Sequence, residues 1–466
     1  MARKYKRYDP NQTYLLPQNP KEWLPEGHLA LFIQNVVTNF LDLSPIFDHY
    51  ERSGMGAPPY HPAMMTELLF YGYCVSVRSS RRMAKAIEDD VAFRVLAAGN
   101  LPDFRTISDF RKIHIDALKP LFVQVVLLCE QAGLVTLGTV SIDGTKVKAN
   151  ASLSRNRTYK SLCKKTDQLE EEIERMLKEG IEIDEEEDRL YGPDKRGDEL
   201  PEGFRTRKEQ LERLRKAKEE LEEEMSKEAE AQEKKIEVRK EKEAELGRKL
   251  RGRKPNAPPT APDEKAKRNT TDADSRIMKT RTGHVQGYNA QAAVDVETQV
   301  IVAADVTQDC NDLHQGEPML RACEENLGRM PERGLMDAGY WFEEFVLRMQ
   351  DKVDLYVATN KDWKQRKAMR ERPPPRGRIP KSATLKERME RKLLTKNGRE
   401  MYKKRAPSSE PVFGQIKDGR GLDSFLLRGT RKVNGEWNLM TMTHNLLKLW
   451  RSGALSGMTI AGCPNG

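Results

Sequence analysis

The sequence predicts an α/β protein with a mixed sheet at its core, a helical N-terminal domain and a charged helical insertion. Residues 1–135 have the apolar spacing of helices, whereas alternating β-branched runs begin only at residue 139. Residues 158–262 are instead dominated by Glu, Lys and Arg over most of their length. Because helices repeat every 3.6 residues and strands every two, these patterns separate three parts of the chain.

Composition bounds the number of domains and the kind of partner. The 466 residues are enough for two or three domains, each with its own core. The formal net charge of +9 suits a polyanion, because Lys and Arg release counterions when they neutralise phosphates. A soluble basic protein without a nucleic-acid partner would carry the same charge, so charge alone leaves both interpretations open.

Cysteine usage and the start of the chain predict a cytoplasmic protein. None of the six cysteines forms a C-x-x-C pair or a zinc-ligand spacing with histidine, so we expect reduced thiols. The basic residues at the start are not followed by the apolar core of a secretory signal. No run of about 18 apolar residues occurs, and we therefore expect no membrane span.

The N-terminal domain is predicted to consist of helices separated by turn signals. Helical runs are expected over three segments: His28–Leu43, Ala63–Val77 and Arg81–Leu96. Gly99–Pro102 then breaks the chain, and Thr106 or Ser108 is expected to cap the next helix.

Basic residues concentrate on these helices. A helix, a turn and a helix that carry Arg81, Arg82, Arg105 and Arg111 are typical of a DNA-docking module. The alternative is a packed helical domain whose basic residues face water, and helix-turn-helix units are difficult to distinguish from it in one sequence.

Two charged stretches, 160–188 and 204–250, are predicted to form a helical hairpin. Their few apolar residues recur at steps of three, four and seven: Leu162, Leu169, Ile173 and Met176, then Leu211, Leu214, Leu221 and Met225. This spacing indicates an antiparallel coiled coil that projects from the body. Lys218 falls in an a/d position, so the seam should be weak or need a partner. A partly disordered charged segment is the alternative.

The strands and helices of the core alternate in a recognisable order. Residues 139–149 form a strand that Asp143-Gly144 interrupts, and Tyr288–Val296 forms a hairpin with Gln299–Val306. Further strands are predicted at Gly334–Asp337 and Val353–Thr359. Helices are expected from Pro318, over Phe342–Met349, from near Ser409 and over Trp437–Trp450. A strand, a long insertion, a hairpin and then alternating helices and strands are the order of a ribonuclease-H-like fold.

The predicted domains follow from these segments. Residues 1–135 are the helical, DNA-binding N-terminal domain, and residues 136–157 with 263–450 form the core. Residues 158–262 are the charged insertion and its linker. A second, basic insertion at 361–405 lies within the core and suits contact with a DNA backbone, with Trp363 as a stacking residue. A solvated basic loop is the alternative for this segment.

Three acidic residues stand where metal ligands are expected. Asp143 lies among β-branched neighbours, Asp337 ends an apolar run, and Glu410 directly follows Ser408 and Ser409, either of which suits a helix cap. Each acid also has a structural interpretation: a hairpin turn, a helix cap and a surface helical acid. Carboxylates on rigid elements are what two Mg²⁺ ions need in order to activate a water or 3′-hydroxyl against a phosphodiester.

Several motifs together resemble those of bacterial insertion-sequence transposases. Tyr402, Arg405, Glu410 and Lys417 are similar to the tyrosine–arginine–glutamate–lysine signature of that family. Ile142–Thr145 and Asp337–Tyr340 resemble its first and second aspartate motifs. Gly287–Gln291 resembles a motif of one subgroup, and the block from Tyr60 to Phe110 resembles an InsH-like N-terminal domain. Four residues separate Arg405 from Glu410, where the commonest family pattern has three.

The resemblance implies a DDE transposase that binds the ends of a mobile element and performs metal-dependent DNA cleavage and strand transfer. Asp143, Asp337 and Glu410 would hold two Mg²⁺ ions, for which Mn²⁺ is a possible substitute. Tyr402, Arg405 and Lys417 would position DNA phosphates. The implied partner is double-stranded DNA, and two ends brought together imply a homodimer. A metal-dependent nuclease on the same fold and a non-catalytic DNA-binding protein are the alternatives.

Overall fold

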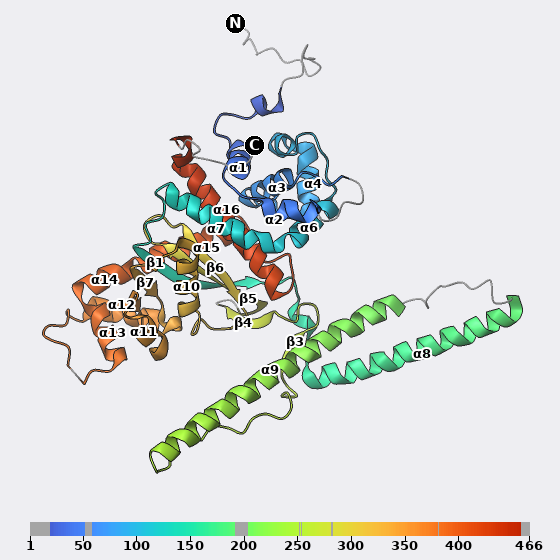
Figure 1. Ribbon diagram of the computed structural model, residues 1–466. Coiled ribbons are helices and arrows are strands. Elements are labelled where there is room, and N and C mark those ends of the chain that lie inside the picture. Colours follow the sequence, from blue (N-terminus) through green and yellow to red (C-terminus); the bar gives the residue numbers. More distant parts are fainter. Residues whose placement is uncertain are drawn as a thin grey trace, which may run out of the picture.

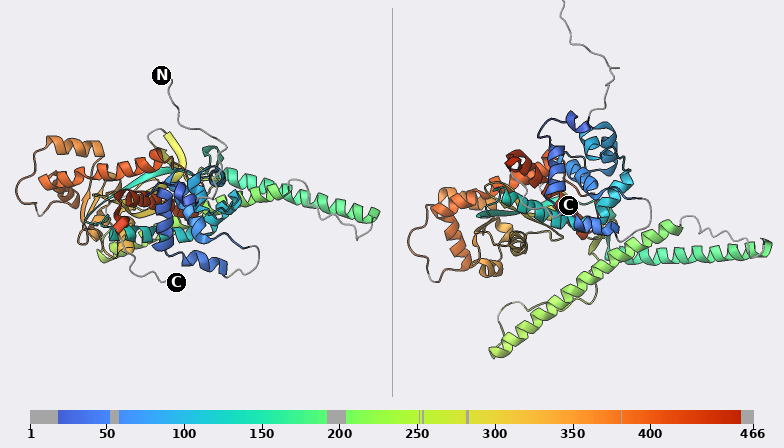
Figure 2. Two further views of the ribbon diagram at one scale, coloured as in Figure 1. Left: turned by 90° about the horizontal axis from the view of Figure 1, so that it is seen from above. Right: turned by 45° about the horizontal axis from the view of Figure 1, so that its top comes forward.

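The computed structural model describes residues 19–51, 58–191, 204–250, 252, 254–280, 283–380 and 382–457. A block of N-terminal helices lies beside a twisted sheet, and two long helices project away from both (Figure 1 and Figure 2). Among the described residues no single helix is long and apolar enough to cross a membrane. The first two α-helices, which meet at a bend of 75°, reach that composition only as a pair.

Among the described residues, seven α-helices build the N-terminal block: α1 (Leu29–Asn39), α2 (Ser44–Glu51), α3 (Pro62–Cys74), α4 (Ser80–Asp89), α5 (Val91–Leu96), α6 (Phe104–Ile113) and α7 (Leu118–Gln131). The predicted single helix over Arg81–Leu96 is wrong. Asp90 ends α4 and starts α5, because its carboxylate accepts hydrogen bonds from the backbone N–H groups of Ala92 and Phe93. The cap of α6 is Asp103 rather than Thr106 or Ser108.

The sheet is mixed, as predicted. Its main strands are β1 (Thr139–Lys148), β4 (Arg276–Thr280), β5 (Gly283–Asp295), β6 (Ile301–Thr307), β7 (Arg333–Met336) and β8 (Asp354–Val357). The order is β4-β5-β1-β7-β8, and β6 also pairs with β5. β5 is antiparallel to β1 and β6, whereas β7 is parallel to β1 and β8. A small second sheet joins β2 (Asn156–Thr158) and β3 (Lys267–Asn269).

β1 runs without interruption through Asp143 and Gly144, so the predicted break is wrong. Gly144 pairs with Gln291 of β5 in continuous register. A Cβ at Gly144 would lie 2.3 Å from the Gln291 side-chain nitrogen, and glycine is therefore needed for close approach rather than for a turn. The hairpin between β5 and β6 is confirmed, and Asp295 accepts hydrogen bonds from the N–H groups of Glu297 and Thr298 in its turn.

Helices cover the sheet and share its core. They are α10 (Gly316–Leu327), α11 (Glu343–Met349), α15 (Arg405–Gly414) and α16 (Thr430–Ser452). α16 contacts β6 as well as α3 and α7, and a single cluster of buried apolar side chains extends from α1 to α16. The N-terminal helices are thus packed onto the core rather than tethered to it.

A buried polar cluster strengthens this junction. The carboxylate of Glu436 on α16 accepts hydrogen bonds from the Tyr73 hydroxyl of α3 and from the backbone N–H groups of Leu426 and Leu427. Arg111 of α6 donates to the same Tyr73 hydroxyl at 3.1 Å. Because the side chains of Tyr73, Arg111 and Glu436 are buried, the cluster fixes how the helical block sits on the core.

Two long helices, α8 (Tyr159–Tyr191) and α9 (Phe204–Glu245), form the insertion. They lie side by side over part of their length, and α9 then continues past the start of α8 (Figure 1 and Figure 2). The predicted seam residues Leu162, Leu169, Leu211, Leu214 and Leu221 are buried between them. Lys218 was expected in the seam between Leu214 and Leu221. In the structure buried Ala217 occupies that position of the seam, and Lys218 is half-buried beside it.

The basic segment 361–405 is largely helical. It contains α12 (Asp362–Glu371), α13 (Leu385–Leu394) and α14 (Lys396–Lys403), and Thr384 with Glu387 forms a capping box at the start of α13. Trp363 is 62% exposed, in agreement with a surface position for this segment.

Candidate active site

Asp143 and Asp337 come from neighbouring parallel strands. β1 and β7 pair with Ser141 opposite Leu335, so continuing this register by two residues places Asp143 beside Asp337. Asp337 follows the last residue of β7 directly. Two acids that are 194 positions apart in sequence therefore meet near the carboxyl end of a parallel pair, where ligands bind in many α/β sheets.

The Asp143 carboxylate is held by groups from α15. Its Oδ2 lies 3.3 Å from Arg405 Nη1 and accepts a hydrogen bond from Ser409 Oγ at 3.1 Å. Arg405 and Ser409 are four residues apart, and so they face β1 from the same side of the helix. Burial raises the pKa of Asp143 to about 6, because the lowering effect of Arg405 is smaller and nearby Asp337 adds repulsion.

Asp337 has a second, local task. Its side chain accepts a hydrogen bond from the Gly339 N–H at 2.8 Å and caps the short 3-10 helix η4 (Ala338–Tyr340). The capping alternative for Asp337 is thus present in the structure, together with the position beside Asp143.

Glu410 lies on α15, one residue after Ser409, and its side chain is exposed. We expected Ser408 or Ser409 to cap a helix that starts there. That expectation is wrong, because α15 already begins at Arg405, and Pro411 lies inside it. Among the described residues, no three His, Cys, Asp or Glu side chains are grouped closely enough to hold a metal ion. The structure therefore brings the two aspartates together and leaves the Glu410 carboxylate outside the pair.

The other residues of the signature are tied into the protein. Lys417 lies in a short π-helical segment, Gln415–Gly419, and its Nζ donates to Thr145 Oγ1 at 3.1 Å and to the Lys146 carbonyl at 3.0 Å. Burial lowers the pKa of Lys417. Tyr402 is buried, and the Arg405 guanidinium lies 5.9 Å from the centre of its ring. Tyr402 therefore packs under Arg405 rather than facing solvent.

The sequence did not single out a fourth acid, Asp312, which follows β6 and precedes α10. Its Oδ1 accepts hydrogen bonds from Asn289 Nδ2 and Gln291 Nε2, both at 2.7 Å, and lies 3.6 Å from Lys146 Nζ. A Cβ at Gly339 would lie 2.9 Å from Asp337 Oδ1 and 3.5 Å from Asp312 Oδ2, so these carboxylates flank the same space. The only sequence signal was an acid in a loop at a strand end.

The predicted DNA-binding arginines of the N-terminal block divide into two groups. Arg81 and Arg82 on α4 and Arg105 on α6 are exposed. Arg81 and Arg105 both lie over the Phe104 ring, at 5.1 and 5.7 Å from its centre. Arg111 is buried and donates to Tyr73 and to the Arg78 carbonyl, so its expected contact with DNA is corrected to a structural role.

Two cavities of about 560 and 650 Å³ open beside these arginines. The first is lined mainly by the starts of α4 and α6 and the second by Arg78, Arg82 and the segment after the π-helix. Leu426 borders both cavities, so the basic helices adjoin the part of the chain that follows Lys417.

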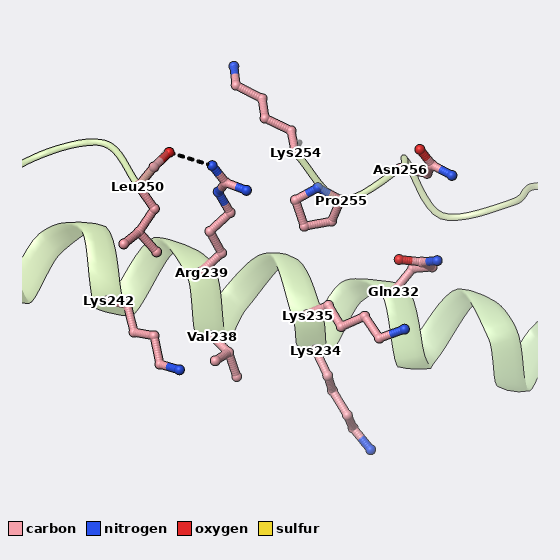
Figure 3. A pocket seen from close by; sticks show the side chains of 10 residues that line it. All are labelled: Gln232, Lys234, Lys235, Val238, Arg239, Lys242, Leu250, Lys254, Pro255 and Asn256. Carbon is pink, nitrogen blue, oxygen red and sulfur yellow. Dashed lines mark hydrogen bonds between the residues drawn. The ribbon is translucent and has the colours of Figure 1, made fainter. Parts of the chain in front are cut away.

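A further basic cavity, of about 710 Å³, lies on the far part of α9 against the returning chain. Figure 3 shows that its cations do not converge, because Lys234 and Lys242 point away from the helix on the side opposite Lys254. Arg239 instead donates to the Leu250 carbonyl and so holds the returning chain. The lining residues contain no cluster of acids, and this cavity is separate from the paired aspartates.

Comparison with known families decides the function. Residues 18–113 match a transposase domain, DUF772, and residues 365–450 match a transposase DDE domain. The chain is a DNA transposase with a DDE domain. Such enzymes bind the ends of a mobile element and use divalent metal, usually Mg²⁺, to cleave and join DNA strands. No curated protein and no solved structure matches the chain.

The two matches cover different parts of the transposase. The first contains the exposed arginines of α4 and α6, and the second contains Glu410, the segment around it and most of α16. Asp143 and Asp337 lie outside both matches. A DDE domain implies a ribonuclease-H-like fold, with which the mixed order β6-β5-β1-β7-β8 agrees.

The paired aspartates fit a divalent metal ion. Both supply hard carboxylate oxygens, and their mutual repulsion contributes to the raised pKa of Asp143. A cation placed between them would remove that repulsion and favour the ionised form.

Proposed function

We propose that Asp143, Asp337 and Glu410 are the catalytic carboxylates of this transposase and hold two Mg²⁺ ions. The observation that carries the proposal is the pairing of β1 with β7, which sets Asp143, in the middle of β1, beside Asp337, directly after the end of β7. Glu410 is supported by its place next to Ser409, which donates to Asp143, and by the match of its segment to a DDE domain. Bound Mg²⁺ would activate the attacking oxygen and stabilise the leaving one, and Mn²⁺ should substitute.

Tyr402, Arg405, Glu410 and Lys417 are proposed to form the tyrosine–arginine–glutamate–lysine signature of insertion-sequence transposases. In this arrangement Arg405 first orients Asp143, with Tyr402 packed behind it. Lys417 holds the end of β1 through Thr145 and the Lys146 carbonyl. We propose that the Arg405 and Lys417 side chains contact DNA phosphates only at the edge of this site, because each already binds a group of the protein.

Arg81, Arg82 and Arg105 are proposed to bind DNA ends through the phosphate backbone, within an InsH-like N-terminal domain. They are exposed on α4 and α6 around the two basic cavities, which adjoin the chain after Lys417. This location would lead a bound duplex from the N-terminal domain of residues 1–135 towards the core of residues 136–157 and 263–450. Arginine suits the task because its planar guanidinium binds phosphate in two places.

We further propose a homodimer in which the coiled-coil insertion, residues 158–262, contributes to contact between copies. Two DNA ends must be brought together, and the hairpin extends well beyond the body of the protein (Figure 1). Light scattering of the protein with and without DNA tests this assembly. A monomer under both conditions would contradict it, and loss of the dimer on removal of residues 160–245 would assign it to the hairpin.

The catalytic assignment is tested by cleavage of DNA that carries the terminal repeats of the element encoding this chain. Wild-type protein with Mg²⁺ should release a free 3′-hydroxyl and join it to target DNA. Asp143→Asn, Asp337→Asn and Glu410→Gln should each abolish both products while DNA binding is retained. Cleavage without joining would indicate a nuclease instead of a strand-transfer enzyme.

Glu400→Gln is the matched control for Glu410→Gln, because Glu400 is also an exposed glutamate, on neighbouring α14. It should cleave at the wild-type rate. Wild-type cleavage by the Glu410 variant would remove Glu410 from the site while leaving the two aspartates in place.

A further inference from the structure

A buried network of side chains connects β5 to the turn that carries Asp337. Gln291 Nε2 donates to Asp312 Oδ1 at 2.7 Å and to Asn289 Oδ1 at 3.0 Å. With its nitrogen used in this way, the Gln291 oxygen is left as an acceptor, and it receives the hydroxyl of Tyr340. Gln291, Asn289 and Tyr340 are all at most 1% exposed.

The network reaches both strands of the aspartate pair. Tyr340 is the last residue of η4, the turn that Asp337 caps. On the other side, the Gln291 amide packs directly against Gly144, the residue after Asp143. Because successive side chains of a strand point to opposite faces, the network supports β1 from the face opposite Arg405 and Ser409.

Asp312 anchors the network with a charge. Its Oδ1 receives both amide groups, from Asn289 and Gln291, and Lys146 Nζ is 3.6 Å away. Because both amide nitrogens donate to the same carboxylate oxygen, the orientation of the Asn289 and Gln291 side chains is determined. Turning either buried amide would break its hydrogen bond to Asp312. The hydroxyl of Tyr340 therefore meets an acceptor of defined position.

We propose that Asp312, Gln291 and Tyr340 are positioning residues that set the Asp337 turn against Asp143 in the geometry that binds metal. This inference rests on the proposed function and names residues to which no catalytic step is assigned. Partners outside the first ring of metal ligands commonly orient those ligands and change metal affinity by about 10- to 100-fold.

Direct Mn²⁺ binding to the full chain with element-end DNA tests this proposal, with free Mn²⁺ measured by electron paramagnetic resonance. Tyr340→Phe removes one hydroxyl and keeps the ring. We expect Mn²⁺ affinity to fall about 10-fold or more, and the Mg²⁺ concentration for half-maximal cleavage to rise in parallel, with unchanged DNA affinity. Wild-type Mn²⁺ affinity in Tyr340→Phe would overturn the proposal.

Tyr288→Phe is the matched control. Tyr288 is also a buried tyrosine, and its hydroxyl also binds a carboxylate, that of Asp272, but it lies outside the network. Its loss should lower stability and leave Mn²⁺ affinity within about twofold of wild type, by analogy with a purely structural hydroxyl. An equal loss of Mn²⁺ affinity in both variants would show a general packing effect and overturn the proposal.

Gly144→Ala offers a second route if Tyr340→Phe does not fold. The added Cβ would displace the Gln291 amide, which it approaches to 2.3 Å, and should weaken Mn²⁺ binding in the same way. Asp143→Asn distinguishes a failure of the carboxylate assignment from a failure of the network proposal alone. If it binds Mn²⁺ like wild type, the carboxylate assignment fails and the network with it. If it loses Mn²⁺ while Tyr340→Phe and Gly144→Ala keep it, only the network proposal fails.

Discussion

Arg405 and Asp143 form a largely buried ion pair, with 3.3 Å between Nη1 and Oδ2, across 262 positions of sequence. Their side chains are only 6% and 18% exposed. The pair docks α15 on β1 and so brings the segment of Glu410 to the strand that carries the first aspartate. Because burial opposes the charge of Asp143 while Arg405 favours it, the pair sets the protonation of a proposed metal ligand.

Cleavage should fall as the pH drops through about 6. The pKa of Asp143 is raised to about 6 without metal, so the ionised, metal-binding form predominates above that pH and is lost below it. Rates measured between pH 5 and 8 at low Mg²⁺ should show this acid limb. Saturating Mg²⁺ should move it to lower pH, because the metal favours the ionised carboxylate. A limb that does not respond to Mg²⁺ would contradict the assignment.

Arg405→Gln should move the acid limb to higher pH. Arg405 lowers the pKa of Asp143, and its removal leaves burial and the charge of Asp337 unopposed. The variant should therefore bind Mg²⁺ more weakly at neutral pH and recover partly in alkaline buffer. Lys404→Gln is the control, because Lys404 is adjacent but exposed and pairs with Glu297. An unchanged pH profile in Arg405→Gln would show that the ion pair with Arg405 does not control the pKa of Asp143.

Asp143→Asn should stabilise the metal-free protein above pH 6. A carboxyl whose pKa is higher in the folded state than in the unfolded state reduces stability as pH rises from about 4 to about 6, and the loss persists above that. The neutral amide of the variant does not ionise and so avoids this loss of stability. We therefore expect the free energy of unfolding to rise by about 1–3 kcal/mol. Denaturant unfolding at pH 8 and pH 4 should show the gain only at pH 8. Added Mg²⁺ should narrow the difference between the two proteins.

Replacing Arg81, Arg82 and Arg105 together with alanine should weaken DNA binding and flatten its salt dependence. Each phosphate contact contributes about 0.9 to the slope of log affinity against log salt, so a loss of about 2–3 is expected. A triple variant of Lys234, Lys235 and Lys242 on α9 is the control, because these cations diverge in Figure 3. If the control alone flattens the slope, the DNA path follows the hairpin instead of α4 and α6.

Local sequence was sufficient wherever a segment's neighbours in space are also its neighbours in the chain. The β5–β6 hairpin, most of α3 and the part of α16 from Trp437 onwards were predicted because their patterns depend on nearby residues. Predictions were wrong where the same residue suits two different structural roles. Asp90 separates α4 from α5 by capping α5. Asp143-Gly144 is typical of a turn in sequence, but in the structure Gly144 allows the close approach of the Gln291 side chain.

The order of the motifs, which resembles that of insertion-sequence transposases, predicted the two aspartates as metal ligands, and this role stays a prediction. Sequence could not show that Ser409 binds Asp143 instead of capping a helix, or that Tyr402 and Arg111 are buried. Asp312 carried no pattern of its own, since its role depends on amides that lie 23 and 21 positions away.

By itself, the sequence determined the mixed α/β class of fold and indicated a transposase with three candidate acids and a charged helical insertion. The tertiary structure decided which of these residues meet. The parallel pairing of β1 and β7 sets Asp143 beside Asp337, and the docking of α15 adds Arg405 and Ser409. The physical reason is that strand pairing and helix docking join residues far apart in the chain, and burial then gives their charges partners and pKa values that no local pattern contains.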